Sequence, residues 1–226
     1  MNSFEKEINK SFLKLNIPFV DYGITSSNEI SLEGIFRHPE FPILPQDENS
    51  LFRMASMTKP ITAYLTLAVL NDNRIDLHEE VGTYLPEINN LKIAYKEAET
   101  IQYKKNNVAI SFHHLLNCTS GHAYEHHDPL ISELISKKEV APMKNGDDAF
   151  LKAPLVFTPG KKWSYGISYG WLGKAIEAIS GLTLDENLNK YLCNHLDLKQ
   201  TSFNPTQSSK VILAPVYFRD SGGSYS

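Results

Sequence analysis

The stretch that decides the fold lies at residues 51–63 and reads Leu-Phe-Arg-Met-Ala-Ser-Met-Thr-Lys-Pro-Ile-Thr-Ala. It contains a Ser-x-x-Lys motif formed by Ser56 and Lys59, and it leads into a mostly apolar run. Proline is tolerated only in the first turn of a helix, so Pro60 requires the helix to begin within about a turn of that position. The pattern predicts a helix over Phe52–Asn71, with Ser56 near its start.

The three-residue spacing places Ser56 and Lys59 on one helix face, with their Cβ atoms about 5–6 Å apart. Lysine accepts a proton only when neutral, so the expected role needs burial to lower the Lys59 pKa from about 10.4. The helix N-terminus would make the Ser56 N–H an oxyanion donor. The simpler alternative is that Ser56 caps the helix and Lys59 extends into solvent. The second copy of the motif, Ser11-Phe-Leu-Lys14, lies on a charged helix face, where the lysine stays hydrated.

Composition excludes several classes of protein. The chain has 226 residues and a net charge of −4, and it has no block of like charges typical of nucleic-acid or anionic-lipid binders. No apolar run approaches the roughly 18 residues of a membrane span. The N-terminus alternates in charge where a secretory signal needs an apolar segment, so we expect a cytoplasmic protein. In that compartment Cys118 and Cys193 are expected to be small buried apolar residues and not a disulfide. The sequence gives no indication of the oligomeric state.

Other parts of the chain divide into short elements. Before the motif we expect a helix at 3–15, a β-hairpin at 17–37 with its turn at Ser26-Ser-Asn28, and a proline-rich loop at 38–49. After it, the pattern predicts helices at 112–117, 130–138, 171–180 and 183–193, and a strand at 211–218. The segment from about 76 to 160 is interpreted as a helical subdomain inserted into the remainder.

Five stretches, in order and with characteristic spacing, resemble one family. They are residues 51–63, Val81-Gly-Thr-Tyr-Leu-Pro-Glu87, His114-Leu-Leu-Asn-Cys-Thr-Ser-Gly121, Phe157-Thr-Pro-Gly-Lys-Lys-Trp-Ser-Tyr165 and His195-Leu-Asp-Leu-Lys-Gln-Thr-Ser-Phe203. The chain is similar to the serine β-lactamase and penicillin-binding-protein superfamily, in the class C-like branch that includes β-lactamase-related carboxylesterases. This resemblance implies an α+β fold, an α/β sandwich of β-lactamase/transpeptidase type in which helices flank an antiparallel sheet. Residues 1–226 would form a single such domain.

The resemblance assigns Ser56 as the acylated nucleophile, Lys59 as its proton partner and Tyr165 as the group that moves a proton to and from the leaving group. It implies neither a metal nor a cofactor. Ile167 stands where β-lactamases of this branch carry asparagine, so we expect small esters to be preferred over β-lactams. Ile167 and Trp163 are the expected substrate-binding residues. The alternative for Trp163 is that it packs at a subdomain junction.

Two other motifs compete with this assignment. Gly166-Ile-Ser168-Tyr-Gly170 matches the nucleophile elbow of α/β-hydrolases, but only Asp185 and His195 follow, too close together for that fold. Five histidines between residues 113 and 127 could indicate a zinc site, but no cysteine or carboxylate pattern accompanies them. We interpret them as loop and surface residues: His113, His114, His122, His126 and His127.

The third motif of the family, a Lys-Thr-Gly-like or Trp-x-Gly-like triplet, is not found after Tyr165. We therefore expect the domain to be C-terminally incomplete. The predicted function is a serine hydrolase that acts through an acyl-enzyme on small ester or amide substrates, as a carboxylesterase or acyltransferase. The alternatives are β-lactamase or D-amino peptidase activity, or a catalytically inactive ligand-binding protein.

Overall fold

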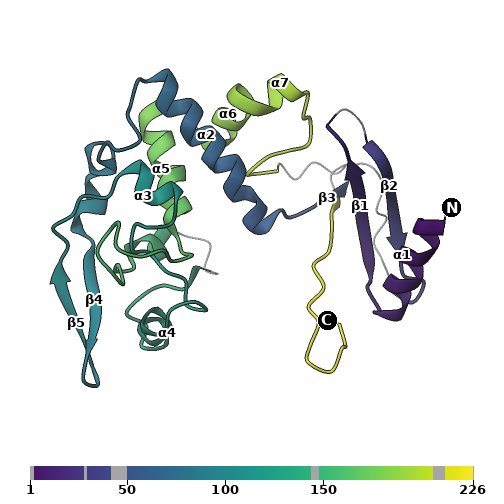
Figure 1. Ribbon diagram of the computed structural model, residues 1–226, viewed down its shortest axis with the longest axis horizontal. Helices are drawn as coiled ribbons and strands as arrows, with labels where there is room; N and C mark the ends of the chain where they lie inside the picture. Colours follow the sequence, from purple (N-terminus) through teal and green to yellow (C-terminus); the bar gives the residue numbers. More distant parts are fainter. Residues whose placement is uncertain (1–2, 28–29, 42–49, 144–147, 206–211, 226) are drawn as a thin grey trace. The chain divides into compact units, whose positions relative to one another are not determined.

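The computed structural model describes residues 3–27, 30–41, 50–143, 148–205 and 212–225 (Figure 1). The chain divides into two compact units. Unit 1 comprises Met1–Arg53 and Thr206–Ser226, and unit 2 comprises Met54–Pro205. Among the described residues, no helix is both long and apolar enough to cross a membrane.

Unit 1 opens with the helix and the hairpin that the sequence predicts. Helix α1 (Ser3–Lys14) is followed by β1 (Phe19–Thr25) and β2 (Ile30–Arg37), which pair antiparallel. The ring of Phe12 on α1 lies 5.3 Å from that of Phe36 on β2, so the apolar face of the helix packs on the hairpin. Part of the predicted turn and most of the loop at 38–49 lie outside the described residues.

A short parallel pair completes unit 1. Strand β3 (Ser50–Leu51) pairs with β6 (Ile212–Leu213). The predicted strand at 211–218 is therefore too long, because β3 offers only two residues for a ladder. The described strands form three pairs, of which two are antiparallel and this one is parallel, so the helices and antiparallel strands agree with the predicted α+β class.

Unit 2 contains most of the helices. They are α2 (Thr58–Asp72), α3 (Phe112–Leu116), α4 (Pro129–Ser136), α5 (Ser168–Ser180), α6 (Leu184–Leu188) and α7 (Asn194–Leu196). Single turns of other helix types are η1 (Ala55–Met57), η2 (Val81–Thr83), η3 (Pro86–Asn90), η5 (Asp148–Lys152) and η6 (Asn189–Cys193). All five helices that the sequence predicts in this part of the chain are present.

The helix that follows the Ser-x-x-Lys motif begins later than predicted. Residues Phe52–Met54 are not helical, and the single turn η1 precedes α2. Ala55 has a φ of +46°, a left-handed conformation that a helix cannot continue through. Pro60 is the third residue of α2, within the first turn as expected.

A hairpin lies inside the segment that was expected to be helical. Strands β4 (Lys92–Glu97) and β5 (Thr100–Lys105) pair antiparallel around a turn in which Ala98 has a φ of +51°. Of its side chains, only those of Ile93 and Ala94 are buried, so the hairpin adds little to the core. In β5 the residues Ile101 and Tyr103 alternate with polar ones, a strand signal that the helical interpretation missed. The boundaries of the predicted insert stay a prediction.

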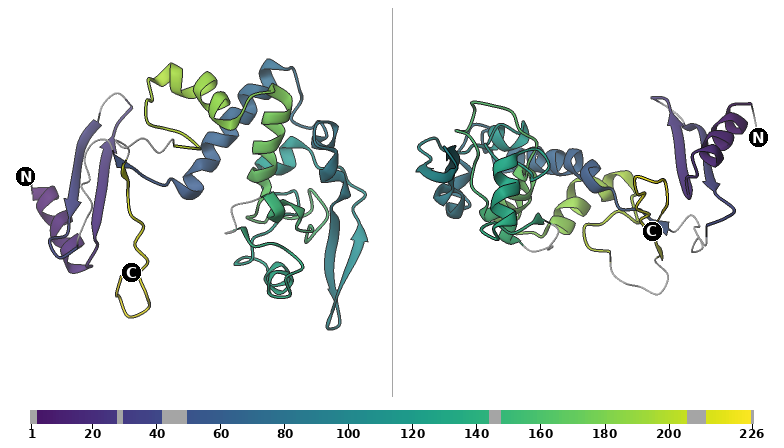
Figure 2. Two further views of the ribbon diagram at one scale, coloured as in Figure 1. Left: turned by 180° about the vertical axis from the view of Figure 1, so that it is seen from behind. Right: turned by 90° about the horizontal axis from the view of Figure 1, so that it is seen from below.

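The core of unit 2 forms around α2 and α5, which lie side by side (Figures 1 and 2). Leu65 and Val69 on α2 pack with Ile176 on α5 and with Leu188 on α6. The other face of α5 joins a larger apolar cluster through Leu172. Cys118 and Cys193 are both buried and unbridged, as predicted. Shared apolar contacts therefore pack α2, which contains Lys59, against α5, which follows Tyr165.

Candidate active site

The structure brings Ser56 and Lys59 together at the start of α2. Ser56 lies in η1, and Lys59 lies in the first turn of the helix. The Lys59 Nζ donates a hydrogen bond of 3.2 Å to the Ser56 Oγ. Ser56 is exposed and Lys59 is half-buried, so the hydroxyl can be reached by a substrate.

Two tyrosines surround the Lys59 ammonium. Its Nζ lies 4.6 Å from the ring centroid of Tyr165 and 5.4 Å from that of Tyr124. The two rings meet edge to face at 5.4 Å, and the Tyr124 N–H donates to the Tyr165 carbonyl oxygen. Tyr165 was predicted from the sequence. Tyr124 was missed, and the available signal was its place three residues after Gly121, which ends one of the matching stretches.

The pKa values of Lys59 and Tyr165 shift in opposite directions. Burial lowers the pKa of Lys59, but contacts with the hydroxyls of Tyr165 and Tyr124 outweigh it and leave that pKa above 10.5. Hydrogen bonding to Lys59, and then to Ser56, lowers the pKa of Tyr165 below 10.0. The expected fall in the Lys59 pKa is therefore wrong in direction, because a buried ammonium beside two phenols keeps its proton.

The two predicted substrate-binding residues lie in different environments. Ile167 is only 5% exposed, and its side chain packs in the larger apolar cluster of unit 2. Trp163 is 68% exposed. Burial leaves Ile167 little surface to offer a substrate, and neither residue lines the cavity beside Lys59. Trp171, in contrast, is buried in the core.

The elbow serine is inaccessible. Ser168 has no exposed surface, and its Oγ forms a 2.8 Å hydrogen bond with the Ser120 Oγ. The Ser120 Oγ also lies 2.9 Å from the Nδ1 of His122, which is buried as well, so the interpretation of His122 as a surface residue is wrong. Asp185 instead accepts hydrogen bonds from the backbone N–H groups of Phe203 and Asn204.

The remaining histidines do not converge on a metal site. Within the described ranges of the chain, no three His, Cys, Asp or Glu side chains are grouped so that they could hold an ion. His113, His126 and His127 are exposed, and His114 is half-buried. The His127 ring lies edge-on to Tyr165 at 5.7 Å, which places it at the border of the site.

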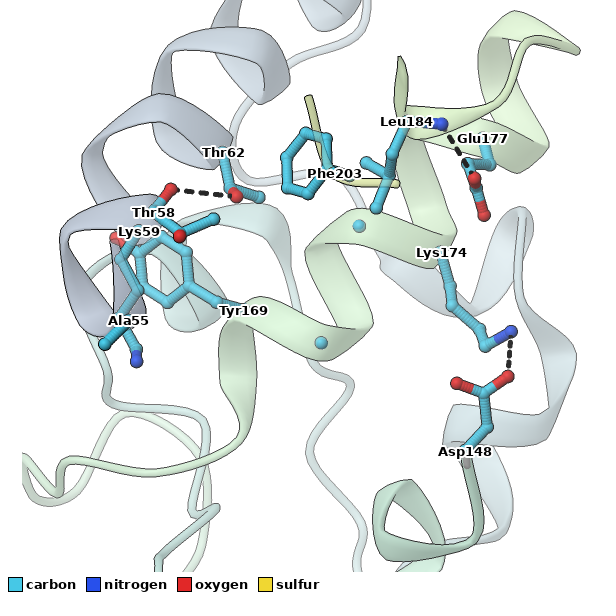
Figure 3. A pocket seen from close by; sticks show the side chains of 12 residues that line it. Ala55, Thr58, Lys59, Thr62, Asp148, Tyr169, Lys174, Glu177, Leu184 and Phe203 are labelled. Carbon is cyan, nitrogen blue, oxygen red and sulfur yellow. Dashed lines mark hydrogen bonds and ion pairs between the residues drawn. The ribbon is translucent and has the colours of Figure 1, made fainter. Parts of the chain in front are cut away.

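A cavity of about 320 Å³ adjoins the site between α2 and α5 (Figure 3). Lys59, whose Nζ donates to the Ser56 Oγ, is one of its lining residues, whereas Ser56 is not. The other lining residues come from η1, α2, η5, α5, α6 and the segment after α7. They are Ala55, Thr58, Thr62, Asp148, Tyr169, Gly170, Gly173, Lys174, Glu177, Leu184 and Phe203.

Comparison with known proteins identifies the family of the chain. The family model described as Beta-lactamase matches residues 40–223. The chain belongs to the beta-lactamase family. One relative is the monacolin J acid methylbutanoyltransferase of Aspergillus terreus, 30% identical over 158 residues that cover 69% of this chain and 38% of the relative. The lovastatin esterase of Penicillium rubens is 26% identical over 167 residues, which cover 71% of this chain and 41% of that protein.

The solved structures of the family agree in fold. The unliganded simvastatin synthase from Aspergillus terreus superposes with a TM-score of 0.79 and 26% identity, over 98% of this chain and 60% of that one. The predicted membership of the serine β-lactamase superfamily is thereby confirmed. The chain spans about 40% of the length of the curated relatives that it matches.

Proposed function

We propose that this chain carries the acylating machinery of a serine acyl-transfer enzyme, which acts as a carboxylesterase or acyltransferase on small esters. The 3.2 Å hydrogen bond between the Lys59 Nζ and the Ser56 Oγ carries the proposal, together with the lowered pKa of Tyr165 beside both. A hydroxyl held between a cation and a phenol of lowered pKa is an activated nucleophile.

The proposed reaction begins with proton transfer from Ser56 to Tyr165. The Lys59 ammonium stabilises the Tyr165 phenolate, which takes the proton of the Ser56 hydroxyl while the Oγ attacks the ester carbonyl carbon. The Ser56 N–H is the proposed donor to the resulting oxyanion. When the tetrahedral intermediate collapses, the bond to the leaving alcohol breaks and Tyr165 returns the proton to that oxygen. Water or a second alcohol then attacks the carbonyl carbon of the acyl-enzyme. Tyr165 takes the proton of the attacking group and returns it to the Ser56 Oγ as the ester bond to the enzyme breaks.

The substrate class is supported by the relatives. Their names describe an acyltransferase and an esterase, which share an acyl-enzyme route and differ only in the acceptor. We extend this chemistry to small esters for the present chain, with amides as a second class. A cytoplasmic location, expected from the N-terminal sequence, belongs to the same proposal.

Labelling with a fluorophosphonate probe tests the nucleophile. We expect one covalent adduct by intact-protein mass spectrometry. It should be lost in Ser56→Ala and retained in Ser168→Ala, because Ser168 is buried. An adduct that survives Ser56→Ala and maps by peptide sequencing to Ser168 would transfer the role to the elbow serine.

A catalytically silent ligand-binding protein is the second candidate, because the raised pKa of Lys59 keeps its ammonium protonated and unable to take the proton of Ser56 itself. It predicts no turnover of p-nitrophenyl esters above the Ser56→Ala background. A burst of p-nitrophenol equal to the protein concentration would exclude it, since a burst measures accumulation of the acyl-enzyme. Nitrocefin, added as a parallel substrate, tests β-lactamase activity. Faster turnover of nitrocefin than of the esters would contradict the ester proposal.

A further inference from the structure

We propose that the cavity between α2 and α5 holds the acyl chain of the substrate and selects aliphatic acyl groups longer than acetyl. This inference rests on the proposed function of Ser56 and names the part of the molecule that determines its substrate. The cavity had no expected role, because the sequence pointed to Trp163 and Ile167 as the substrate-binding residues.

The cavity lies on the helix face next to the nucleophile. Ala55, Thr58 and Thr62 line the cavity and are spaced three and four residues apart. Ser56 is the residue after Ala55. Lys59 connects the cavity with the nucleophile, because it lines the cavity and its Nζ donates to the Ser56 Oγ. Ser56 itself does not line the cavity, so the proposed path of an acyl group bonded to that oxygen runs past Lys59.

The chemistry of the walls favours an apolar occupant. The Thr62 hydroxyl donates to the Thr58 carbonyl oxygen, and the Tyr169 hydroxyl donates to the Leu116 carbonyl oxygen. The Glu177 carboxylate accepts from the Leu184 N–H. Lys174 forms an ion pair with Asp148 at the edge of the cavity (Figure 3). Since these polar side chains already have partners, none of them requires a polar group on the ligand.

Phe203 forms one wall of the cavity and is held in place by Asp185. The Asp185 carboxylate accepts hydrogen bonds of 2.6 Å from the Phe203 N–H and of 3.0 Å from the Asn204 N–H. It also accepts from the Ser202 hydroxyl. In Figure 3 the Phe203 ring lies between Thr62 and Leu184. These hydrogen bonds hold the backbone at Phe203, and we expect its ring to set an upper limit on the length of acyl chain that fits.

Gly173 on α5 has no side chain, and this leaves space in the cavity for the acyl chain of the substrate. A Cβ at this position would come 3.4 Å from the Leu184 Cδ1, which is an ordinary van der Waals contact. A Cβ there fits without a backbone clash, and the methyl groups of a valine would extend from it toward the cavity and Leu184. Gly173→Val is therefore expected to shorten the cavity, and Phe203→Ala to lengthen it.

The test measures kcat/KM for the p-nitrophenyl esters of acetate, hexanoate and decanoate. For the wild type we expect a rise from acetyl to hexanoyl, because each buried methylene is worth up to about fourfold in kcat/KM. Gly173→Val should lower the hexanoyl-to-acetyl ratio about tenfold, and Phe203→Ala should raise the decanoyl-to-hexanoyl ratio about tenfold. Ala178→Val is the matched control, because Ala178 is exposed on the same helix and does not line the cavity.

The outcomes separate this inference from the proposed function. Opposite shifts in the two cavity variants, with an unchanged profile in Ala178→Val, would support the acyl pocket, since partial unfolding cannot move chain-length preference in both directions. Ser56-dependent turnover with the same chain-length profile in all variants would overturn the acyl pocket alone. Turnover that is unaffected by Ser56→Ala, or no turnover by the wild type, would overturn both.

Discussion

In the proposed mechanism Lys59 and Tyr165 have different tasks. Removing a proton from Ser56 needs a base, and stabilising the negative charge that develops needs a cation. The contact with Lys59 lowers the pKa of Tyr165, and the contacts with Tyr165 and Tyr124 keep the pKa of Lys59 above 10.5. In the proposed mechanism the lysine is therefore the cation, and the tyrosine is the base.

Tyr165→Phe tests this division of tasks. General-base catalysis is worth about 10²- to 10⁴-fold, so kcat/KM for an ester should fall by that factor. In the wild type kcat/KM should rise with pH as Tyr165 loses its proton, with a midpoint below 10.0, and fall only above 10.5 as Lys59 loses its own. The rising limb should disappear in the variant.

Tyr103→Phe is the control for that measurement. Tyr103 lies on β5, and its hydroxyl interacts with Glu139, so its loss should leave the pH profile of kcat/KM unchanged. A Tyr165→Phe enzyme within tenfold of the wild type, with the rising limb intact, would make Lys59 the base after all.

At the scale of elements, the junction between η1 and α2 presents the nucleophile. Ala55 precedes Ser56 and has a φ of +46°, which costs a residue with a Cβ about 1–2 kcal/mol. The left-handed residue is the first of η1, the turn that carries Ser56 and precedes α2. Ser56 follows it directly and is exposed.

Ala55→Gly should leave the free energy of unfolding unchanged or raise it by up to about 1 kcal/mol. Glycine adopts positive φ without strain, and this gain offsets the larger backbone entropy of glycine in the unfolded chain. Ala63→Gly, in the interior of α2, is the matched control and should lower the free energy of unfolding by about 1 kcal/mol. Urea unfolding measures both, and an equal loss in the two variants would contradict the left-handed conformation of Ala55.

At the scale of the whole molecule, the stability of unit 2 depends on a histidine buried without charge. His122 is 1% exposed, and burial lowers its pKa from 6.5 to about 3. Its ring lies 6.4 Å from that of Trp171, and its Nδ1 hydrogen-bonds the Ser120 hydroxyl that also contacts Ser168. The motif that resembles a nucleophile elbow therefore has a structural role in the core.

The free energy of unfolding should fall as the pH decreases from about 6.5 toward 3. In that range the unfolded chain binds a proton at His122 and the folded chain does not, so protonation favours unfolding by up to about 1.4 kcal/mol per pH unit. Urea unfolding followed by the fluorescence of Trp171 measures this slope. His122→Gln should reduce the slope, whereas His195→Gln, on an exposed residue, should leave it unchanged. An equal slope in the wild type and His122→Gln would show that the histidine is not buried neutral.

The sequence by itself determined the features that depend on neighbouring residues. The helix α5 ends where Gly181 adopts a φ of +69°, which glycine allows without strain, and Pro60 limits where α2 can start. The hairpin of β1 and β2 follows from the alternation of its side chains. Ser56, Lys59 and Tyr165 could be named because the matching stretches occur in a fixed order. The glycine, proline and hairpin signals each lie within a short segment of chain, whereas the order of the matching stretches extends over residues 51–203.

Only the tertiary structure decided which groups share an environment. Tyr124 reaches Lys59 across 65 positions of sequence, and that contact helps to reverse the expected shift of the lysine pKa. Ser168 matches a catalytic motif, yet packing against Ser120 buries it completely. The cavity beside Lys59 forms where α2, α5 and the segment holding Phe203 come together. The Lys59 pKa depends on desolvation and on the distance between charges, and the accessibility of Ser168 depends on burial. All of these depend on contacts between residues far apart in the sequence, which a local sequence pattern does not predict.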